Sequence, residues 1–377
     1  MPDELPVNDP GFGDLDRRYP EKTFYLGQVF NDTTNSYKLA WFIAILSLVE
    51  RSTQRSLPLK DILVEMAVVA WPPVCLYRLS LGRQDKLQEA VQGIRVRSGL
   101  PPNAKPQEIR NHINGMPAAQ SDLALLLRYV PTRFLAPWFA DQLRGVPDLR
   151  RSTVIQKLAG ESQSTPLACP YWFINGEIRL NQGWRSFLSE NAAVVRAFAE
   201  HHLAQYLQAR NPNVPGVINK LTVPLVRQLS AAITFWRTVR AELDRQGTPG
   251  EIVDIYTGHP LPERFSIDHF LPWSFVAHDL LWNLTPVEPV TNSSKSDVVP
   301  DLGLYLPRMA KLQLSAIQAL QGRERLLEDY TDCFQLDVPG LMSLGEEGLL
   351  KRYQAVVLPQ AQIAINQGFQ AGWRWQN

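Results

Sequence analysis

Apolar residues dominate one long stretch near the start of the chain, residues 37–52. The polar run 31–36 directly before it offers several residues that favour a helix N-terminus. The apolar positions cover most faces of a helix, so this pattern predicts a buried helix over 37–52. A second stretch, 61–70, has apolar residues at helical spacing and is followed by Trp71-Pro72-Pro73, where we expect the helix to break because proline lacks an amide hydrogen.

Apolar residues at helical spacing recur through much of the remaining chain. The segments with this pattern are 85–96, 107–114, 121–128, 138–143, 189–209, 224–245 and 306–327. Two β-prone tetrads, Tyr171–Ile174 and Glu177–Leu180, flank Asn175-Gly176 and predict a β-hairpin, because this pair favours the two-residue turn of hairpins. Residues 1–35 are rich in Pro, Gly, Asp and Asn, and we expect them to be extended over the surface.

These patterns indicate a mainly α protein. Gln246–Gly250 (QGTPG) has the composition of a linker and separates two parts of the chain. We divide the chain into a mostly helical region, 1–248, a region with few helical positions, 249–301, and a helical C-terminal segment, 302–377, that we expect to pack on the rest. A length of 377 residues is compatible with two or three domains.

Composition places the chain among globular proteins, with 45% hydrophobic and 20% charged residues. The formal net charge is +1, so binding to a polyanion requires local basic surfaces or a partner. Cys75, Cys169 and Cys333 lie far apart, which argues against a disulfide framework and favours a reducing cytoplasm. The N-terminus has no secretory signal pattern. The longest apolar run, Leu39–Val49, is shorter than the ~20 residues of a membrane span.

The residues with the most informative spacing lie between 250 and 301. Asp268-His269 comes first, then Pro272 and Ser274, then Asn283, and finally the run Asn292-Ser293-Ser294-Lys295-Ser296-Asp297. This order resembles HNH (ββα-metal) endonucleases of the Asp-His…Asn…Asn subtype. It is similar to the HNH domains of RNA-guided CRISPR effector nucleases, which also run DHxxPxSF, then Asn before a short strand, then NxxKSDxxP. The resemblance implies a mainly α chain with an embedded ββα-metal nuclease module.

The resemblance also implies a role for each matching residue. Hydrolysis of a phosphodiester requires a deprotonated water and a cation near the charge that develops on the leaving oxygen. His269 is expected to be the base, because a neutral imidazole accepts a proton near working pH. Asp268 and Asn292 are expected to bind Mg²⁺ or Mn²⁺ through oxygen atoms. With His269 we group Asn283, expected to hold the histidine-bearing loop, and Lys295, expected to contact a phosphate oxygen, as the catalytic set.

The stretch before this motif departs from the wider family. Many HNH proteins carry a Cys-x-x-Cys pair there for a structural zinc, whereas this chain has Ile255–His259 (IYTGH). We therefore expect no zinc knuckle and a module that is braced by packing. The flanking helices and the aromatic residues Phe265, Phe270, Trp273 and Trp282 are expected to supply that packing.

Asp268 and His269 are adjacent, so a regular strand would point their side chains to opposite faces. Both reach one site only where the end of the strand is irregular, and Pro272 close by favours such an irregularity. Asp297 is expected to be a helix-associated structural partner rather than a ligand.

Other histidines have plainer interpretations. His259 is expected to be a solvated turn residue. His278-Asp279 is expected to form a structural hydrogen bond, with positioning of the site as the alternative. His201-His202 lies within a helix, where successive side chains point about 100° apart, so the two cannot share a metal.

Basic residues gather on the helix before the linker. Arg227, Arg237, Arg240 and Arg245 form a candidate phosphate-tracking face. Acidic residues interleave with them, however, which favours a solvated helix face.

We interpret the chain as a metal-dependent endonuclease that cleaves DNA, double-stranded by preference, to 5′-phosphate and 3′-hydroxyl ends. A protein or guide-complex partner that supplies target choice is expected, and a membrane is not. A role in bacterial restriction or antiviral defence follows by analogy. The alternatives are an RNA-cleaving HNH nuclease or toxin, because ββα-metal sites grip the phosphate backbone, and a catalytically silent nucleic-acid-binding subunit. Retention of Asp268, His269 and Asn292 argues against the silent subunit.

Overall fold

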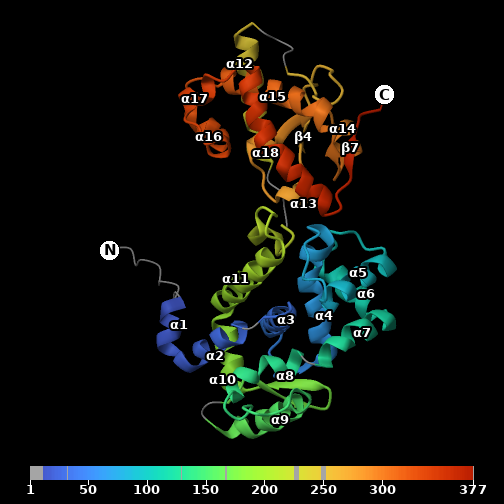
Figure 1. The fold of residues 1–377 in the computed structure, drawn as a ribbon, viewed down its shortest axis with the longest axis vertical. Helices are drawn as coiled ribbons and strands as arrows, with labels where there is room; N and C mark the ends of the chain where they lie inside the picture. Colours follow the sequence, from blue (N-terminus) through green and yellow to red (C-terminus); the bar gives the residue numbers. More distant parts are fainter. Residues whose placement is uncertain are drawn as a thin grey trace, which may run out of the picture. The chain divides into compact units, whose positions relative to one another are not determined.

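The structure is a computed structural model that describes residues 12–31, 33–128, 130–165, 168–224, 229–247 and 252–376. The chain forms two compact units, Met1–Pro212 with Lys220–Val223, and Asn213–Asn219 with Pro224–Asn377 (Figure 1). Helices make up most of the described residues, and the sheets have only two or three strands. The predicted mainly α fold is confirmed.

The first unit contains eleven described α-helices and one small sheet. Its α-helices are α1 (Phe12–Arg18), α2 (Pro20–Phe30), α3 (Tyr37–Arg51), α4 (Leu59–Trp71), α5 (Lys86–Ser98), α6 (Pro106–Asn114), α7 (Pro117–Ala124), α8 (Val130–Phe134), α9 (Asp148–Glu161), α10 (Gln182–Glu190) and α11 (Ala192–Arg210). Its strands are β1 (Ser56–Pro58), β2 (Tyr171–Ile174) and β3 (Glu177–Leu180). Its shorter helical turns are η1 (Pro72–Leu76), η2 (Leu125–Arg128), η3 (Ala136–Phe139) and η4 (Ser162–Ser164).

Helix α3 forms the centre of this unit. It packs against α4, α8, α10 and α11, so apolar side chains on most of its faces are buried. The helix predicted at 37–52 is confirmed, with its end at Arg51. Trp41 Nε1 donates to the Tyr171 hydroxyl at 3.0 Å, and that hydroxyl donates to the Pro131 carbonyl at 2.7 Å. These two bonds join the central helix and α8 to the sheet.

The predicted β-hairpin is confirmed as β2 and β3, which pair antiparallel from Tyr171↔Leu180 to Ile174↔Glu177. Asn175 and Gly176 have φ values of 47° and 81°, as a type I′ turn requires. Strand β1 adds to the other edge of β3. We did not predict β1, because a strand of three residues is too short to show an alternating pattern.

The expectation that the N-terminal segment is extended was wrong for residues 12–30, which form α1 and α2. Pro20 occupies the first turn of α2, where its missing amide hydrogen has no intrahelical partner to lose, so here proline begins a helix. Leu26, Val29 and Phe30 are the buried residues of α2. Residues 1–11 lie outside the described residues.

Other predicted helices of this unit fall close to α5, α6, and α7 with η2. The helix predicted at 138–143 was wrong, because only the 3₁₀ turn η3 and further turns occur there. The helix expected over 189–209 is α11, and α10 ends just before it. Helix α9 was missed, since only Ile155 and Ala159 are buried on it. At the Pro72-Pro73 pair the α-helix ends as predicted, but the chain continues through the π-helical turn η1.

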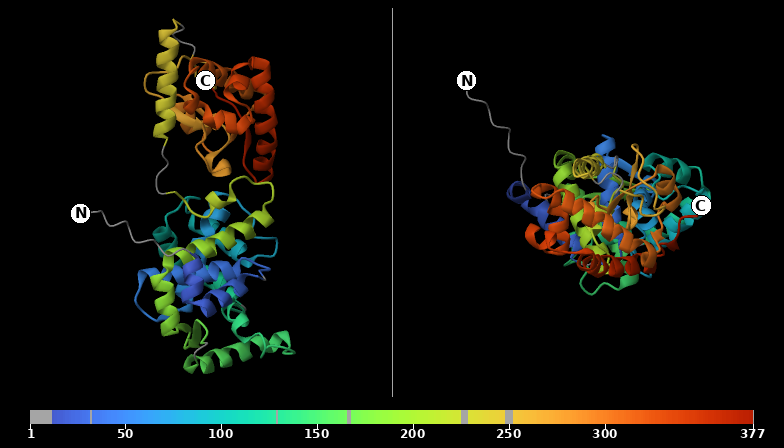
Figure 2. Two further views of the ribbon diagram at one scale, coloured as in Figure 1. Left: turned by 90° about the vertical axis from the view of Figure 1, so that its left-hand side faces the viewer. Right: turned by 90° about the horizontal axis from the view of Figure 1, so that it is seen from above.

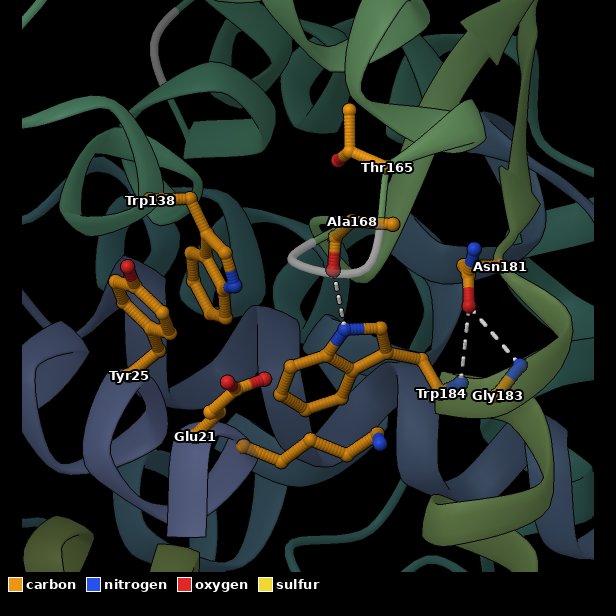
Figure 3. Close-up of a pocket in the computed structure, with 9 residues that line it drawn as sticks. Glu21, Tyr25, Trp138, Thr165, Ala168, Asn181, Gly183 and Trp184 are labelled. Carbon is orange, nitrogen blue, oxygen red and sulfur yellow. Dashed lines mark hydrogen bonds between the residues drawn. The ribbon is translucent and has the colours of Figure 1, made fainter. Parts of the chain in front are cut away.

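A pocket on the first unit has an aromatic wall (Figure 3). Tyr25 stacks on Trp138 with 5.2 Å between ring centroids, and Trp138 meets Trp184 edge-on at 5.5 Å. Trp184 Nε1 donates to the Ala168 carbonyl at 2.7 Å, which fixes this ring in the wall. None of the residues predicted for the nuclease site lines this pocket.

The second unit combines one hairpin with helices from both sides of it in sequence. Its helices are α12 (Ser230–Arg245), α13 (Trp273–Val276), α14 (Pro289–Lys295), α15 (Leu302–Ala319), α16 (Glu328–Phe334), α17 (Val338–Met342) and α18 (Glu346–Asn366). Its strands are β4 (Ser266–His269), β5 (Leu284–Val287), β6 (Val299–Pro300) and β7 (Ala371–Trp373). Its 3₁₀ turns are η6 (Leu281–Asn283) and η7 (Glu324–Leu327), and η5 (Val217–Lys220) lies at the boundary between the units.

One hydrophobic core unites this unit. Helix α15 packs against α12 and α18, α12 also contacts β4 and β5, and buried side chains of all three helices join those of the hairpin. In Figure 2, left, α12 (yellow) and α18 (red) flank the orange hairpin segment. The helix predicted at 306–327 begins earlier and ends at Ala319, and the one predicted at 224–245 begins at Ser230, with residues 225–228 outside the described part. The 21-residue helix α18 was not predicted.

None of the described helices is both long and apolar enough to cross a bilayer. The three cysteines are free thiols.

Tyr171→Phe is expected to destabilise the first unit by about 1–3 kcal/mol, because it leaves the buried Trp41 indole N–H and the Pro131 carbonyl without their shared partner. Tyr19→Phe is the control, since its hydroxyl makes only an exposed 3.4 Å bond to Glu190. Native-state hydrogen exchange of the α3 and β2 amides measures the difference. Equal protection in both variants would contradict the role of the Tyr171 hydroxyl.

Candidate active site

The predicted ββα arrangement is present. Strand β4 pairs antiparallel with β5 from Ser266↔Val287 to His269↔Leu284, and α14 begins directly after β5 and packs on β4. Pro289 stands in the first turn of α14, where proline is tolerated. All four residues of β5 are buried, so the hairpin is held from both faces. This arrangement brings α14 back to the end of β4 that carries Asp268 and His269.

Strand β4 is regular through His269. Asp268 lies opposite Thr285 and His269 opposite Leu284, and the pairing continues with the Phe270 amide, which donates to the Asn283 carbonyl at 2.8 Å. The irregular strand end that we expected beside Pro272 is therefore absent. Regular pleating points the Asp268 and His269 side chains to opposite faces.

Asp268 is buried, and its carboxylate has two hydrogen-bond partners. Its side chain is 3% exposed, Tyr256 donates to Oδ2 at 2.7 Å, and Lys295 Nζ lies 3.1 Å from both carboxylate oxygens. Burial raises the pKa of Asp268, and the charge of Lys295 opposes that rise. Burial and the neighbouring carboxylate raise the pKa of Tyr256 well above its usual value, so the phenol keeps the proton that it donates.

Lys295 joins α14 to β4 through two bonds. Besides the Asp268 carboxylate, Nζ donates to the His269 carbonyl at 2.7 Å. The side chain is fully buried, with no exposed fraction. The ammonium group therefore lies inside the ββα arrangement and not on its surface.

His269 is paired with an acid that the sequence interpretation gave only a secondary role. The His269 side chain is 6% exposed, and its Nε2 lies 2.8 Å from Asp279 Oδ1. The His278-Asp279 pair was noted in the sequence, but no pattern connected it to His269. The contact between Asp279 and His269 depends on the path of the loop after α13, which the sequence does not reveal.

Asn283 clamps the chain just beyond His269. Its Oδ1 accepts from the Leu271 amide at 2.9 Å, and its Nδ2 donates to the Leu271 carbonyl at 3.0 Å. The side chain is fully buried. Both halves of the amide are thus used by the main chain of the histidine-bearing loop.

Asn292 lies on α14, where its amide approaches β4. Its Nδ2 is 3.4 Å from the carbonyl of Ile267, the residue before Asp268. Its Oδ1 has no hydrogen-bond partner among the described residues. Within that same part of the chain, no hydrogen bond joins the side chains of Asp268, His269 and Asn292 to one another.

Two buried hydroxyl groups near these residues lack partners. Thr285 lies directly opposite Asp268, so its side chain is on the same face of the hairpin. Its Oγ1 and that of Thr291, which precedes Asn292 on α14, have no hydrogen-bond partner among the residues described. Buried polar groups in proteins are usually satisfied, so these two oxygens are positions where a further polar group would be stabilised.

The loop at the expected zinc-knuckle position is organised around Asp254. Its buried carboxylate accepts from the Tyr256 amide at 2.8 Å and the Glu288 amide at 2.9 Å. The loop closes through a bridge between Val253 and Pro260, and Gly258 turns it with a φ of 78°. No group of three or more His, Cys, Asp or Glu residues that could hold a metal occurs in the described part.

Packing braces the hairpin as predicted, with helices and aromatic residues in contact. Phe270 and Trp282 are buried in the core of the unit, and Phe265 packs against it. Trp273 is only half-buried. The Tyr353 hydroxyl of α18 donates to the Trp282 carbonyl at 3.1 Å, which ties the C-terminal helices to the loop before β5.

Three polar residues around the site have local partners. Asp297 accepts a hydrogen bond from Ser274, a contact between α13, in the segment that connects the two strands, and the segment that follows α14. His259 is exposed, 3.7 Å from Glu288, as expected of a turn residue. His278 packs on Trp282 with 5.3 Å between ring centroids.

The arginines of α12 do not form a free phosphate-tracking face. Arg240 donates to the carbonyls of Leu261 and Pro262, and Arg245 pairs with Glu242. Arg237 is exposed. Arg227 lies outside the described residues.

Residues 254–301 match the family model of HNH endonucleases. The second unit contains an HNH endonuclease domain. No curated protein and no solved structure matches the chain. HNH endonucleases are hydrolases that act on nucleic acid and typically use divalent metals, so the HNH domain supports nuclease activity.

Asp254→Ala is expected to destabilise the second unit by about 2–3 kcal/mol, because it leaves the buried Tyr256 amide and the half-buried Glu288 amide without their acceptor. Asp244→Ala on the exposed face of α12 is the control and should change stability by less than about 0.5 kcal/mol. Hydrogen exchange of residues 252–261 and thermal unfolding measure the effect. If both variants unfold alike, Asp254 does not organise this loop.

Proposed function

We propose that the HNH domain hydrolyses phosphodiester bonds of DNA with a divalent metal, Mg²⁺ or Mn²⁺, and with His269 as the general base. The observation that carries this proposal is the return of α14 to the end of β4. It sets the Asn292 amide 3.4 Å from the carbonyl before Asp268, next to the strand end that carries His269. The family match over the same residues supports the assignment.

The residues around Asp268 fit a divalent metal. Asp268 offers an anionic oxygen donor and Asn292 Oδ1 a neutral one without another partner, the kind of donors that hard cations prefer. The Thr285 hydroxyl, on the same face of the hairpin as Asp268, has no hydrogen-bond partner among the described residues, so a metal-bound water would find a polar partner there. We assign Asp268 and Asn292 as the metal ligands. A metal bound there would stabilise negative charge on the leaving oxygen.

The base and the metal act on opposite sides of the phosphorus atom in an in-line displacement. The divergent directions of the Asp268 and His269 side chains are compatible with this requirement. His269 takes a proton from water, the resulting hydroxide forms a bond to phosphorus, and the bond to the 3′ oxygen breaks with its electron pair on that oxygen. After protonation by solvent the products are a 5′-phosphate and a 3′-hydroxyl.

Lys295 and Asn283 act through other residues in this proposal. Lys295 is buried and bonds to Asp268 and to the His269 carbonyl, which supports a role in positioning both residues instead of the phosphate contact that the resemblance implies. Asn283 holds Leu271, two residues after the base. We therefore propose both as positioning residues.

We also propose a partner that supplies target choice. The net charge of +1 gives the chain no general attraction to nucleic acid, and two of the α12 arginines are committed to carbonyls or to an acidic neighbour. Double-stranded DNA as substrate and a role in bacterial restriction or antiviral defence rest on the resemblance to guided effector nucleases.

Wild-type protein with Mg²⁺ or Mn²⁺ is expected to nick or linearise supercoiled plasmid. His269→Ala should lower the cleavage rate by about 10²–10⁴-fold, because the attacking water loses its base. Asn292→Ala should lower it by about 10²-fold or more, because a metal ligand is lost. Gel analysis of single-turnover time courses measures these rates.

His259→Ala is the matched control, because this exposed histidine lies in a turn of the same domain. It should cleave at the wild-type rate, and EDTA should stop both proteins. Equal rates for His259→Ala and His269→Ala would refute the assignment of the base. Cleavage of RNA but not of DNA under the same conditions would replace the proposed substrate.

A further inference from the structure

Asp279 lies against the proposed base, and the order of motif residues does not include an acid at this position. Its Oδ1 is 2.8 Å from His269 Nε2. The Asp279 side chain is 30% exposed and that of His269 is 6% exposed. The pair thus sits at the edge of the domain, with the imidazole on the inner side.

The loop that carries Asp279 is fixed at both ends. Ala277 ends α13 with a φ of 54°, and its amide donates to the Trp273 carbonyl at 2.7 Å. Two residues beyond Asp279, the Leu281 amide donates to Asp329 of α16 at 2.8 Å. These hydrogen bonds on both sides of Asp279 restrain the loop and therefore the position of its carboxylate.

The ring is fixed from its own side as well. The His269 carbonyl accepts from the buried Lys295, and Asn283 holds the main chain at Leu271. The hydrogen bonds to the main chain at His269 and Leu271, together with the Asp279 carboxylate at Nε2, determine the orientation of the imidazole.

The identity of the partner determines the tautomer. An ionised carboxylate can only accept a hydrogen bond, so the nitrogen that faces it must carry the hydrogen. A neutral imidazole has one hydrogen, and its lone pair is then on Nδ1. No described residue hydrogen-bonds to His269 Nδ1.

We propose that Asp279 is the positioning residue of the base, which holds His269 as the Nε2–H tautomer with Nδ1 free to take the proton of the attacking water. In that step the O–H bond of water breaks, the proton moves to Nδ1, and the hydroxide attacks phosphorus. The imidazolium that results is stabilised by the carboxylate at Nε2. The base role in this inference rests on the proposed function, whereas the tautomer does not.

Asp279→Asn is the first test, because it keeps the shape of the side chain but adds an N–H donor that favours the other tautomer. We expect kcat to fall by about 10²–10⁴-fold with KM for plasmid little changed, by analogy with the effect of the same substitution beside the histidine of a serine protease. Asp279→Glu restores an acceptor without a donor and should recover most of the rate. Asp332→Asn, on the exposed surface of α16, is the control and should match wild type.

Nitrogen-15 NMR of histidine-labelled full-length protein measures the tautomer directly, with His269→Ala to assign the signal. Wild type should show a protonated Nε2 and an unprotonated Nδ1, and Asp279→Asn should shift the population toward Nδ1–H. A wild-type kcat in Asp279→Asn, while His269→Ala is inactive, would overturn the positioning role. So would a wild-type Nδ1–H tautomer.

The base role of His269 and the tautomer set by Asp279 are tested by separate measurements. If the wild type cleaves no nucleic acid, the base role falls together with the proposed function. The NMR experiment needs no activity, so it then still decides whether Asp279 sets the tautomer. Thermal unfolding of each variant excludes loss of the fold as the cause of a lower rate.

Discussion

The buried ion pair between Lys295 and Asp268 is the interaction on which the HNH domain depends. A charged group inside a protein is tolerated only when its donors or acceptors are satisfied, and removal of one partner typically costs about 3–5 kcal/mol. Here the Lys295 ammonium bonds to the Asp268 carboxylate and to the His269 carbonyl, and Tyr256 satisfies the carboxylate further. The pair therefore fixes the distance between α14, which carries Asn292, and the strand end that carries His269.

Around this pair, hydrogen bonds from side chains to the main chain brace the hairpin. The Asp254 carboxylate accepts hydrogen bonds from the Tyr256 amide in its own loop and from the amide of Glu288, the residue before α14. Asn283 forms hydrogen bonds with both the amide and the carbonyl of Leu271. Gln313 of α15 donates to the Leu284 carbonyl at 2.8 Å, which connects β5 to the C-terminal helices. Each of these hydrogen bonds needs surrounding structure to exclude water, and this explains why the hairpin shares one core with α12, α15 and α18.

Sequence predicted those parts of the molecule whose signals are local. The apolar faces of α3 and the Asn175-Gly176 turn require no knowledge of distant residues, and both were placed correctly. The ββα order was predicted from spaced motif residues. The N-terminal helices were missed because prolines and glycines were interpreted as loop residues, although Pro20 begins α2. The Asp279 contact with His269 could not be predicted, since it depends on how the loop after α13 returns to β4.

The central claim is that water, activated at His269, attacks a phosphodiester and that the bond to the 3′ oxygen breaks. Cleavage in water enriched in oxygen-18, followed by mass spectrometry of the fragments, tests this claim most directly. The account predicts one labelled oxygen in each new 5′-phosphate and none in the 3′-hydroxyl. Unlabelled 5′-phosphate, or a labelled phosphate at the 3′ end, would contradict it.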